Sequence, residues 1–196
     1  MVVPELLQQI AFIKEIDKLK YIQRKTKLFN RDRNENDAEH SWHLAVMAIV
    51  LAQHANETVD ILKVVKMLLI HDIVEIDAGD TFIYDTQKNH TNTEEERLAA
   101  NRIFGLLPPE QKEELIQIWE EFEACETAEA KFAKAMDRLE PLLQNSSNNG
   151  GTWNEPGVNY EKVYEKKSVI KNGSTTIWEY AEKLINEGVE KGILKK

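Results

Sequence analysis

Apolar residues recur at steps of three and four along almost the whole chain, which is the spacing of one face of an α-helix. Residues 61–70 are apolar nearly all round, and a helix without a polar face is normally central and buried. The β-branched residues in this run could also suggest a strand. The length of the run and the absence of a partner strand elsewhere favour a helix, so we predict an all-α fold.

Capping residues predict where the helices begin. A first helix is expected over residues 6–22, followed by a polar stretch that breaks the pattern. Asn36 or Asp37 can cap a second helix, and Asp60 can cap the apolar one. Thr127 can cap a later helix. We expect about eight helices in all.

Length and composition indicate one domain without a nucleic-acid or membrane partner. The 196 residues can bury a single core, so we expect one domain over 1–196, with its chemical motifs at 19–140 and C-terminal helices at 156–193. The net charge of −9 argues against binding nucleic acid. No apolar stretch reaches the ~18 residues that cross a bilayer, and the N-terminus lacks a secretory signal. We therefore expect a cytoplasmic protein.

A His-Asp pair in the apolar run is the first candidate for chemistry. An ionised Asp72 beside His71 would be costly there unless a metal ion or a charged partner compensated it. His40 and Asp137 lie in similarly apolar helical patterns. Two imidazoles and two carboxylates suit a divalent ion with open water positions. The residues alone leave open that His40 and Asp137 only form hydrogen bonds in the core.

Three motifs carry a resemblance to a known family. Residues 38–42 (AEHSW) resemble the first-histidine motif of the HD-domain metal-dependent phosphohydrolase superfamily. Residues 71–80 (HDIVEIDAGD) resemble the His-Asp segment of its bacterial 5′-deoxynucleotidase branch, and residues 19–24 (LKYIQR) resemble a segment that supplies a phosphate-contacting arginine. With Asp137 following in order, the resemblance covers roughly residues 19–140.

The resemblance implies an HD-domain helical bundle that hydrolyses a phosphomonoester, such as a nucleoside 5′-monophosphate. The implied ligands of one divalent ion (Mn, Co, Mg, Zn or Fe) are His40, His71, Asp72 and Asp137. Water activated by the ion would attack phosphorus, and Glu75 would assist proton transfer. Asp80 would accept a hydrogen bond from a sugar hydroxyl. Arg24 would contact phosphate, and Arg33 is a second candidate because a guanidinium matches phosphate oxygens.

Several further expectations accompany this interpretation. Dinuclear members of the superfamily carry extra histidines before the last aspartate, whereas this chain has only His90 there, which favours one ion. A phosphodiesterase or alarmone hydrolase, and a non-catalytic metal- or nucleotide-binding module, stay open. Similar proteins form dimers, and the apolar residues of the first and last helices could serve a homodimer or the core. The loop at 145–153 could cover a substrate or only connect helices.

Overall fold

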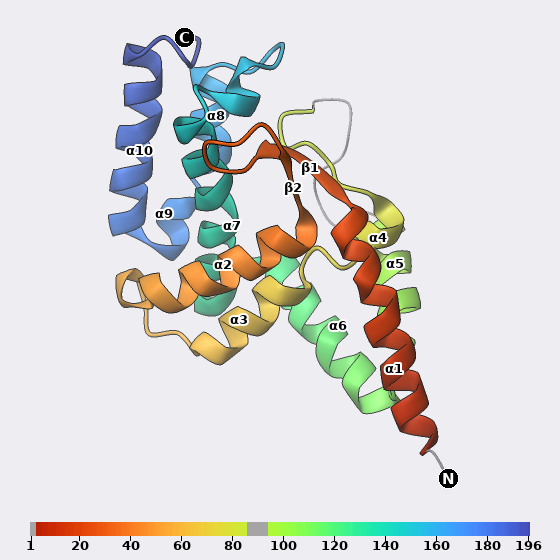
Figure 1. Ribbon diagram of the computed structural model, residues 1–196. Coiled ribbons are helices and arrows are strands. Elements are labelled where there is room, and N and C mark those ends of the chain that lie inside the picture. The colour runs from red at the N-terminus through yellow and green to blue at the C-terminus, as the bar shows by residue number, and fades with distance from the viewer. Residues whose placement is uncertain (1–2, 86–93) are drawn as a thin grey trace.

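The structure is a computed structural model that describes residues 3–85 and 94–196 (Figure 1). Its α-helices are α1 (Pro4–Ile16), α2 (Asp37–Leu51), α3 (Ile61–Ile70), α4 (Glu75–Ala78), α5 (Glu94–Phe104), α6 (Pro109–Ala124), α7 (Ala128–Ser147), α8 (Tyr160–Lys167), α9 (Ile170–Gly173) and α10 (Thr175–Glu190). Short 3-10 helices span Asp17–Tyr21, Ala52–His54 and Gly151–Asn154. Eight of these α-helices have eight or more residues, which confirms the all-α bundle.

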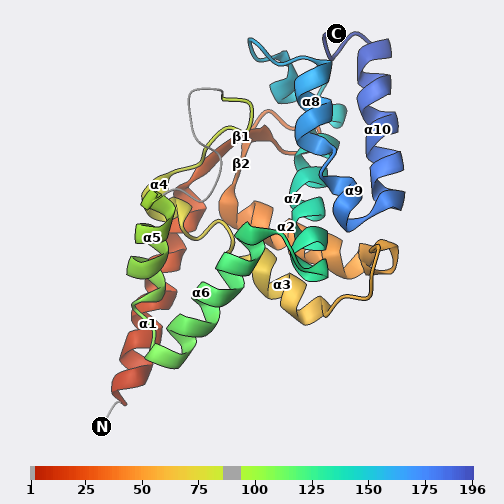
Figure 2. The same cartoon turned by 180° about the vertical axis from the view of Figure 1, so that it is seen from behind.

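Helix α7 lies at the centre of the molecule. Helices α1, α5 and α6 lie on one side and α8 to α10 on the other, with α2 and α3 between them (Figures 1 and 2). Apolar side chains of α7 that are fully or almost fully buried are Ala130, Phe132, Ala133, Ala135, Met136, Leu139 and Leu142. The prediction of a central, buried helix over residues 61–70 holds for one face only, where Val64, Met67, Leu68 and Ile70 are buried. Helix α3 packs against α2, α6 and α7, and its outer face leaves Leu62 63% and Leu69 45% exposed.

The predicted caps of α2 and α3 are confirmed. The side chain of Asn36 accepts a hydrogen bond from the backbone N–H of Glu39 (3.0 Å), and Glu39 Oε2 accepts one from the N–H of Asn36 (3.2 Å). This capping box fixes the first turn of α2. Asp60 Oδ1 accepts from the N–H of Leu62 at 3.0 Å. Both helices therefore begin at defined residues.

A short hairpin precedes α2 and was not predicted. Strand β1 (Gln23–Lys27) pairs antiparallel with β2 (Asn34–Asn36). The first helix ends at Ile16 and gives way to a 3-10 helix, so the expected helix to residue 22 was too long. Side chains alternate across a strand, so Arg24 and Thr26 point to the same side, and both line one cavity.

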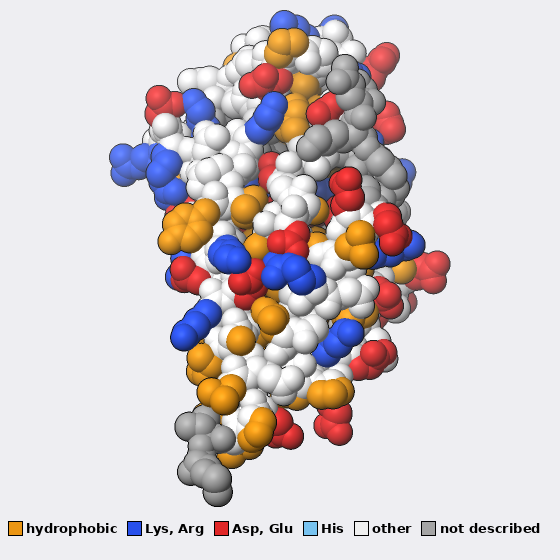
Figure 3. Space-filling model, turned by 90° about the vertical axis from the view of Figure 1, so that its right-hand side faces the viewer, with side chains coloured by type: hydrophobic (Ala, Val, Ile, Leu, Met, Phe, Trp, Pro, Cys, Tyr) orange, Lys and Arg blue, Asp and Glu red, His pale blue; other side chains and the backbone are white. Residues whose placement is uncertain are grey.

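The first and last helices differ in what they expose. Apolar side chains gather at the lower end of the face in Figure 3, beside the N-terminus. The exposed ones at α1 are Val3, Leu6, Leu7, Ile10 and Ile13. Helix α10 instead buries Ile177, Trp178, Ala181 and Ile185 in the core. Within 3–85 and 94–196, no helix is both long and apolar enough to cross a membrane.

Candidate metal centre

Three elements that are distant in the sequence carry the four predicted ligands. His40 lies on the first turn of α2, Asp137 lies in the middle of α7, and all four side chains are buried. The expectation that His71 and Asp72 lie inside a helix was wrong. Helix α3 ends at Ile70, His71 is its C-cap, and Asp72 lies in the turn before α4. The chain leaves the helix at this point and turns both side chains toward α2 and α7.

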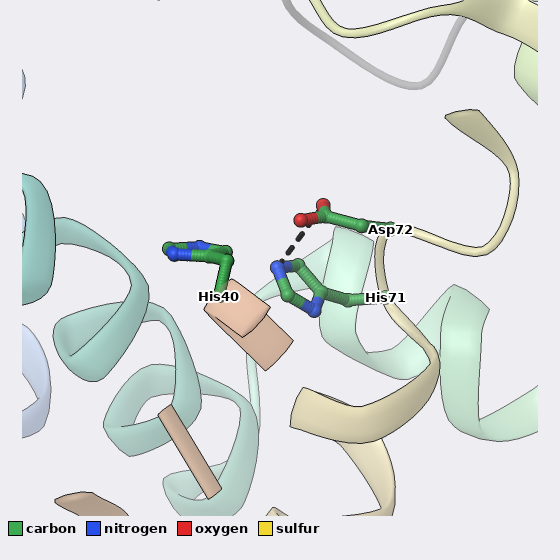
Figure 4. Close-up of side chains that lie close together, drawn as sticks. All are labelled: His40, His71 and Asp72. Atoms are coloured by element: carbon green, nitrogen blue, oxygen red, sulfur yellow. Dashed lines mark ion pairs between the residues drawn. The ribbon is translucent and has the colours of Figure 1, made fainter. Parts of the chain in front are cut away.

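The ligand atoms of these residues lie close together. His71 Nε2 lies 3.0 Å from Asp72 Oδ1, and Figure 4 shows both beside His40. One ligand atom each from His40, His71 and Asp72 lies within 4.8 Å of the others. Asp137 Oδ1 lies 3.3 Å from His40 Nε2 and 3.9 Å from His71 Nε2. The structure therefore brings the predicted quartet together.

The hydrogen bonds around the quartet fit a bound cation. His71 Nδ1 lies 3.0 Å from the carbonyl oxygen of Leu68, so its N–H donates there and the lone pair belongs to Nε2. Burial lowers the pKa of His71 and keeps the ring neutral. Its Nε2 is buried with no hydrogen-bond partner and faces carboxylate oxygens of Asp72 and Asp137. A lone pair beside carboxylate oxygens is unfavourable without a positive charge between them, so this donor set suits a divalent ion.

Asp137 is held as a carboxylate whose Oδ1 faces the two histidines. Burial would raise its pKa, but Arg138 and the hydrogen bond from His40 hold it well below its usual range. Arg138 Nη1 donates to Asp137 Oδ2 at 2.8 Å. The other oxygen, Oδ1, is the one that faces His40 and His71.

Two buried glutamates behind His40 were missed by the sequence analysis. His40 Nδ1 lies 3.3 Å from Glu35 Oε2 and 3.3 Å from Glu140 Oε2. Glu140 Oε1 also lies 3.4 Å from His43 Nδ1. Burial raises the pKa of Glu140, but His40 and His43 outweigh it and lower the value to about 2. Such a carboxylate can orient a ligand histidine. Its position one helical turn after Asp137 was the available signal.

A second group of carboxylates lies beside the first. Oxygens of Asp37, Glu75 and Asp80 lie within 4.8 Å of one another, a spacing that could also hold a cation. Burial and the nearby Asp72 raise the pKa of Asp37 to about 7 and that of Glu75 well above its usual range. These groups therefore share protons or a cation. Asp37 was considered in the sequence only as a helix cap.

Arg24 bridges the two groups. Its Nη1 donates to Asp72 Oδ2 at 3.0 Å and to Asp37 Oδ1 at 3.3 Å. Its Nε lies 3.7 Å from Glu35 Oε2. The guanidinium charge is therefore already matched by carboxylates of the site.

A partly open cavity of about 140 Å³ adjoins these residues. The predicted site residues that line it are Arg24, His71, Asp72, Glu75, Asp80 and Asp137. The structure does not bring Arg33 to the cavity. The Arg33 side chain is 56% exposed and donates from Nη1 and Nη2 to the two carboxylate oxygens of Glu39, each at 2.9 Å. His90 lies outside the described residues.

The segment expected as a loop at 145–153 is helical at both ends, with a turn over residues 148–150 between them. Helix α7 continues to Ser147 and a 3-10 helix begins at Gly151. Asn145 Oδ1 accepts from the N–H of Thr152 at 2.9 Å, and Trp153 is only 1% exposed. Asn145 and Thr152 both line the cavity, so this segment forms part of its wall.

Comparison with known proteins agrees with this geometry. A family model described as "HD domain" matches residues 16–178. The chain belongs to the HD domain family. A crystal structure from Magnetospirillum magnetotacticum, described as a "Predicted metal-dependent phosphohydrolase", is similar to it at 52% sequence identity. That alignment covers 98% of this chain and 96% of the other, with a TM-score of 0.91.

Curated relatives of this HD domain chain carry a more specific name. The proteins named "5'-deoxynucleotidase HDDC2" from Bos taurus and Homo sapiens are each 32% identical to it, over 70% of this chain. The chain spans 66% of the length of these relatives.

Proposed function

We propose that this chain is a metal-dependent phosphomonoesterase that hydrolyses nucleoside 5′-monophosphates. The observation that carries the proposal is one cavity lined by His71, Asp72 and Asp137 together with Glu75 and Asp80. A site that can bind a cation beside proton-carrying acids suits hydrolysis of a phosphate ester. The "5'-deoxynucleotidase" name of the relatives supports the nucleotide class.

The proposed ion is a single divalent cation held by His40, His71, Asp72 and Asp137. When bound, it would polarise the phosphoryl group and lower the pKa of water at the site. Mn, Co, Mg, Zn and Fe all accept such a mixed imidazole and carboxylate set. Metal analysis of the purified protein should give one ion per chain. Two ions per chain would assign the Asp37, Glu75 and Asp80 group to a second cation.

The chain's own residues would position the substrate and move protons. Glu75 Oε2 is buried without a hydrogen-bond partner, so it can take a proton from water or give one to the leaving oxygen. Asp80 faces the same cavity and would accept a hydrogen bond from a sugar hydroxyl. Arg24 would hold Asp72 and Asp37 in place beside the phosphate.

Phosphate release from a panel of ribo- and deoxyribonucleoside 5′-monophosphates, with each candidate metal, tests the proposal. Glu75→Gln should lower kcat by about 10²–10⁴-fold, the usual range for a proton-transfer group, and leave metal content unchanged. Asp72→Asn should lose both the ion and activity. Glu57→Gln, at an exposed position, is the matched control and should behave as wild type.

The outcome also separates the alternatives. A nucleoside monophosphate or pyrophosphate as the product would indicate a phosphodiesterase or an alarmone hydrolase. Metal bound through Asp72 without any turnover would indicate a binding module. The proposal fails if no nucleotide releases phosphate and Asp72→Asn leaves the metal content of the protein unchanged.

The proposal also includes that the protein forms a homodimer and acts in the cytoplasm. The apolar side chains that α1 exposes offer a surface that a second copy could cover. Leu7→Glu with Ile13→Glu should then shift the protein to a monomer in sedimentation velocity. An unchanged sedimentation coefficient would remove α1 from the interface.

A further inference from the structure

The buried or partly buried lysine and arginine side chains that line the cavity differ in their ion-pair partners. Three of them lie near carboxylates of the site. The pairs are Arg24 with Asp72 (3.0 Å), Arg138 with Asp137 (2.8 Å) and Lys134 with Glu123 (3.7 Å). Their charges are therefore already offset within the protein.

Lys167 is the exception. It is the last residue of α8, is 2% exposed and lines the same cavity. Its side chain makes no hydrogen bond and no ion pair with residues 3–85 or 94–196. Burying an ammonium group without a partner is costly. Burial and the neighbouring Arg138 lower the pKa of Lys167 to about 7, which reports the same lack of a partner.

The surroundings of Lys167 indicate the charge of the partner. Asp137 and Glu140 attract the ammonium, while Arg138 and Arg24 repel it. Both acids are committed to the imidazole of His40, at 3.3 Å. An anion in the cavity would have Lys167 and three of the proposed ligands in its wall, because Lys167, His71, Asp72 and Asp137 all line this space.

We propose that Lys167 is a phosphate-binding residue, whose ammonium group donates hydrogen bonds to a non-bridging oxygen of the substrate phosphoryl group. This inference rests on the proposed phosphomonoesterase function and names a residue for it. It also changes the role of Arg24, whose charge is matched by Asp72 and Asp37, from phosphate contact to holding those carboxylates. Helix α8 thus completes a site that α2, α7 and the turn after α3 begin.

Binding of inorganic phosphate to the full-length protein tests this role without requiring turnover. Lys167→Met removes the ammonium and keeps a similar apolar volume. Lys166→Met, on the neighbouring and less buried position of α8, is the matched control. We expect Lys167→Met to raise the phosphate Kd at least tenfold in calorimetry, with and without Mg²⁺, and to raise KM for a nucleotide by a similar factor. Lys166→Met should change neither.

A thermal readout distinguishes this role from a structural one. A lysine that stabilises the fold lowers the melting temperature when it is removed. A lysine that waits for an anion should leave the melting temperature of the ligand-free protein unchanged or raised, and its removal should abolish the rise that phosphate causes. If Lys167→Met does not fold, Lys167→Gln enters the same titration.

Failure of the inference is distinct from failure of the proposed function. A phosphate Kd within twofold of wild type in the folded Lys167 variant would overturn the inference, even if wild type hydrolyses nucleotides. So would wild-type protein that binds no phosphate. If the protein binds phosphate through Lys167 but hydrolyses no nucleotide, the binding role of Lys167 stands and the proposed phosphomonoesterase function fails.

Discussion

Glu140 offers a sharp test of the metal centre, because it touches a proposed ligand without being one. Its Oε2 lies 3.3 Å from His40 Nδ1, while the opposite ring nitrogen, Nε2, faces Asp137. A carboxylate in this position fixes the ring orientation and raises the basicity of the nitrogen that binds the ion. Glu140→Gln keeps the shape and removes the charge, so we expect weaker metal binding.

The structure limits the size of the effect. Losing an outer-shell partner typically costs 10–100-fold in metal affinity. Glu35 Oε2 lies at the same 3.3 Å from His40 Nδ1 and is anchored by Gln144 Nε2, which donates to Glu35 Oε1 at 2.9 Å. Because Glu35 can still accept from His40, Glu140→Gln should weaken binding about tenfold, or about 1.4 kcal/mol. Adding Glu35→Gln should extend the loss to about a hundredfold.

Stability must be followed in the same experiment. The pKa of Glu140 falls from 4.5 to about 2 on folding, so its charge stabilises the fold above pH 4.5, and this contribution is lost as the pH falls toward 2. The shift corresponds to about 3 kcal/mol, which Glu140→Gln should lose at pH 7.

Competition against a fluorescent chelator gives the metal Kd, and circular dichroism confirms that the protein is folded. Glu126→Gln, an exposed position before α7, should match wild type in both. A folded Glu140→Gln variant with wild-type metal affinity would refute the claim that this carboxylate orients His40.

Two further predictions concern a titration and a helix cap. The pKa of Lys167, lowered by burial from 10.5 to about 7, means that the unfolded chain binds more protons between these values. The unfolding free energy of wild type, relative to that of Lys167→Met, should therefore rise by about 4 kcal/mol from pH 7 to pH 10. If urea unfolding gives the same difference between wild type and variant at both pH values, this prediction is wrong. Asn36→Ala removes the capping box of α2 and should cost about 1 kcal/mol, or roughly 2–4 °C in Tm. An unchanged Tm would show that packing alone fixes this helix.

Much of the fold was predictable because its signals are local. Apolar periodicity and side-chain caps act within one or two helical turns, so Asn36 and Asp60 could be identified as the residues that begin α2 and α3. The approach of His40, His71, Asp72 and Asp137 could be expected from apolar setting and motif order. Their binding of an ion stays a prediction.

The remaining features depend on contacts that the sequence does not encode locally. The hairpin pairs Gln23 with Asn36 and Lys27 with Asn34, and no alternating apolar pattern marks these polar strands. The end of α3 at His71 carries no Gly or Pro signal. Lys167 looks like an ordinary lysine in the last turn of a helix, where the helix dipole favours it. Only the packing of α8 against α7 reveals that its side chain is buried in the site.

The charges of the carboxylate groups and of Lys167 together determine what the site can bind. The protein carries a net charge of −9, so its average field repels a phosphate dianion. The carboxylates of the quartet and of the neighbouring acid group outnumber the nearby arginines, which favours binding of a divalent cation among them. Lys167 lines the same cavity and forms no ion pair with a described carboxylate. Binding of a phosphate monoester would need both the divalent cation and the Lys167 ammonium. The bound cation would be surrounded by carboxylates, and the single charge of Lys167 would be too small to reverse the negative potential that these carboxylates create.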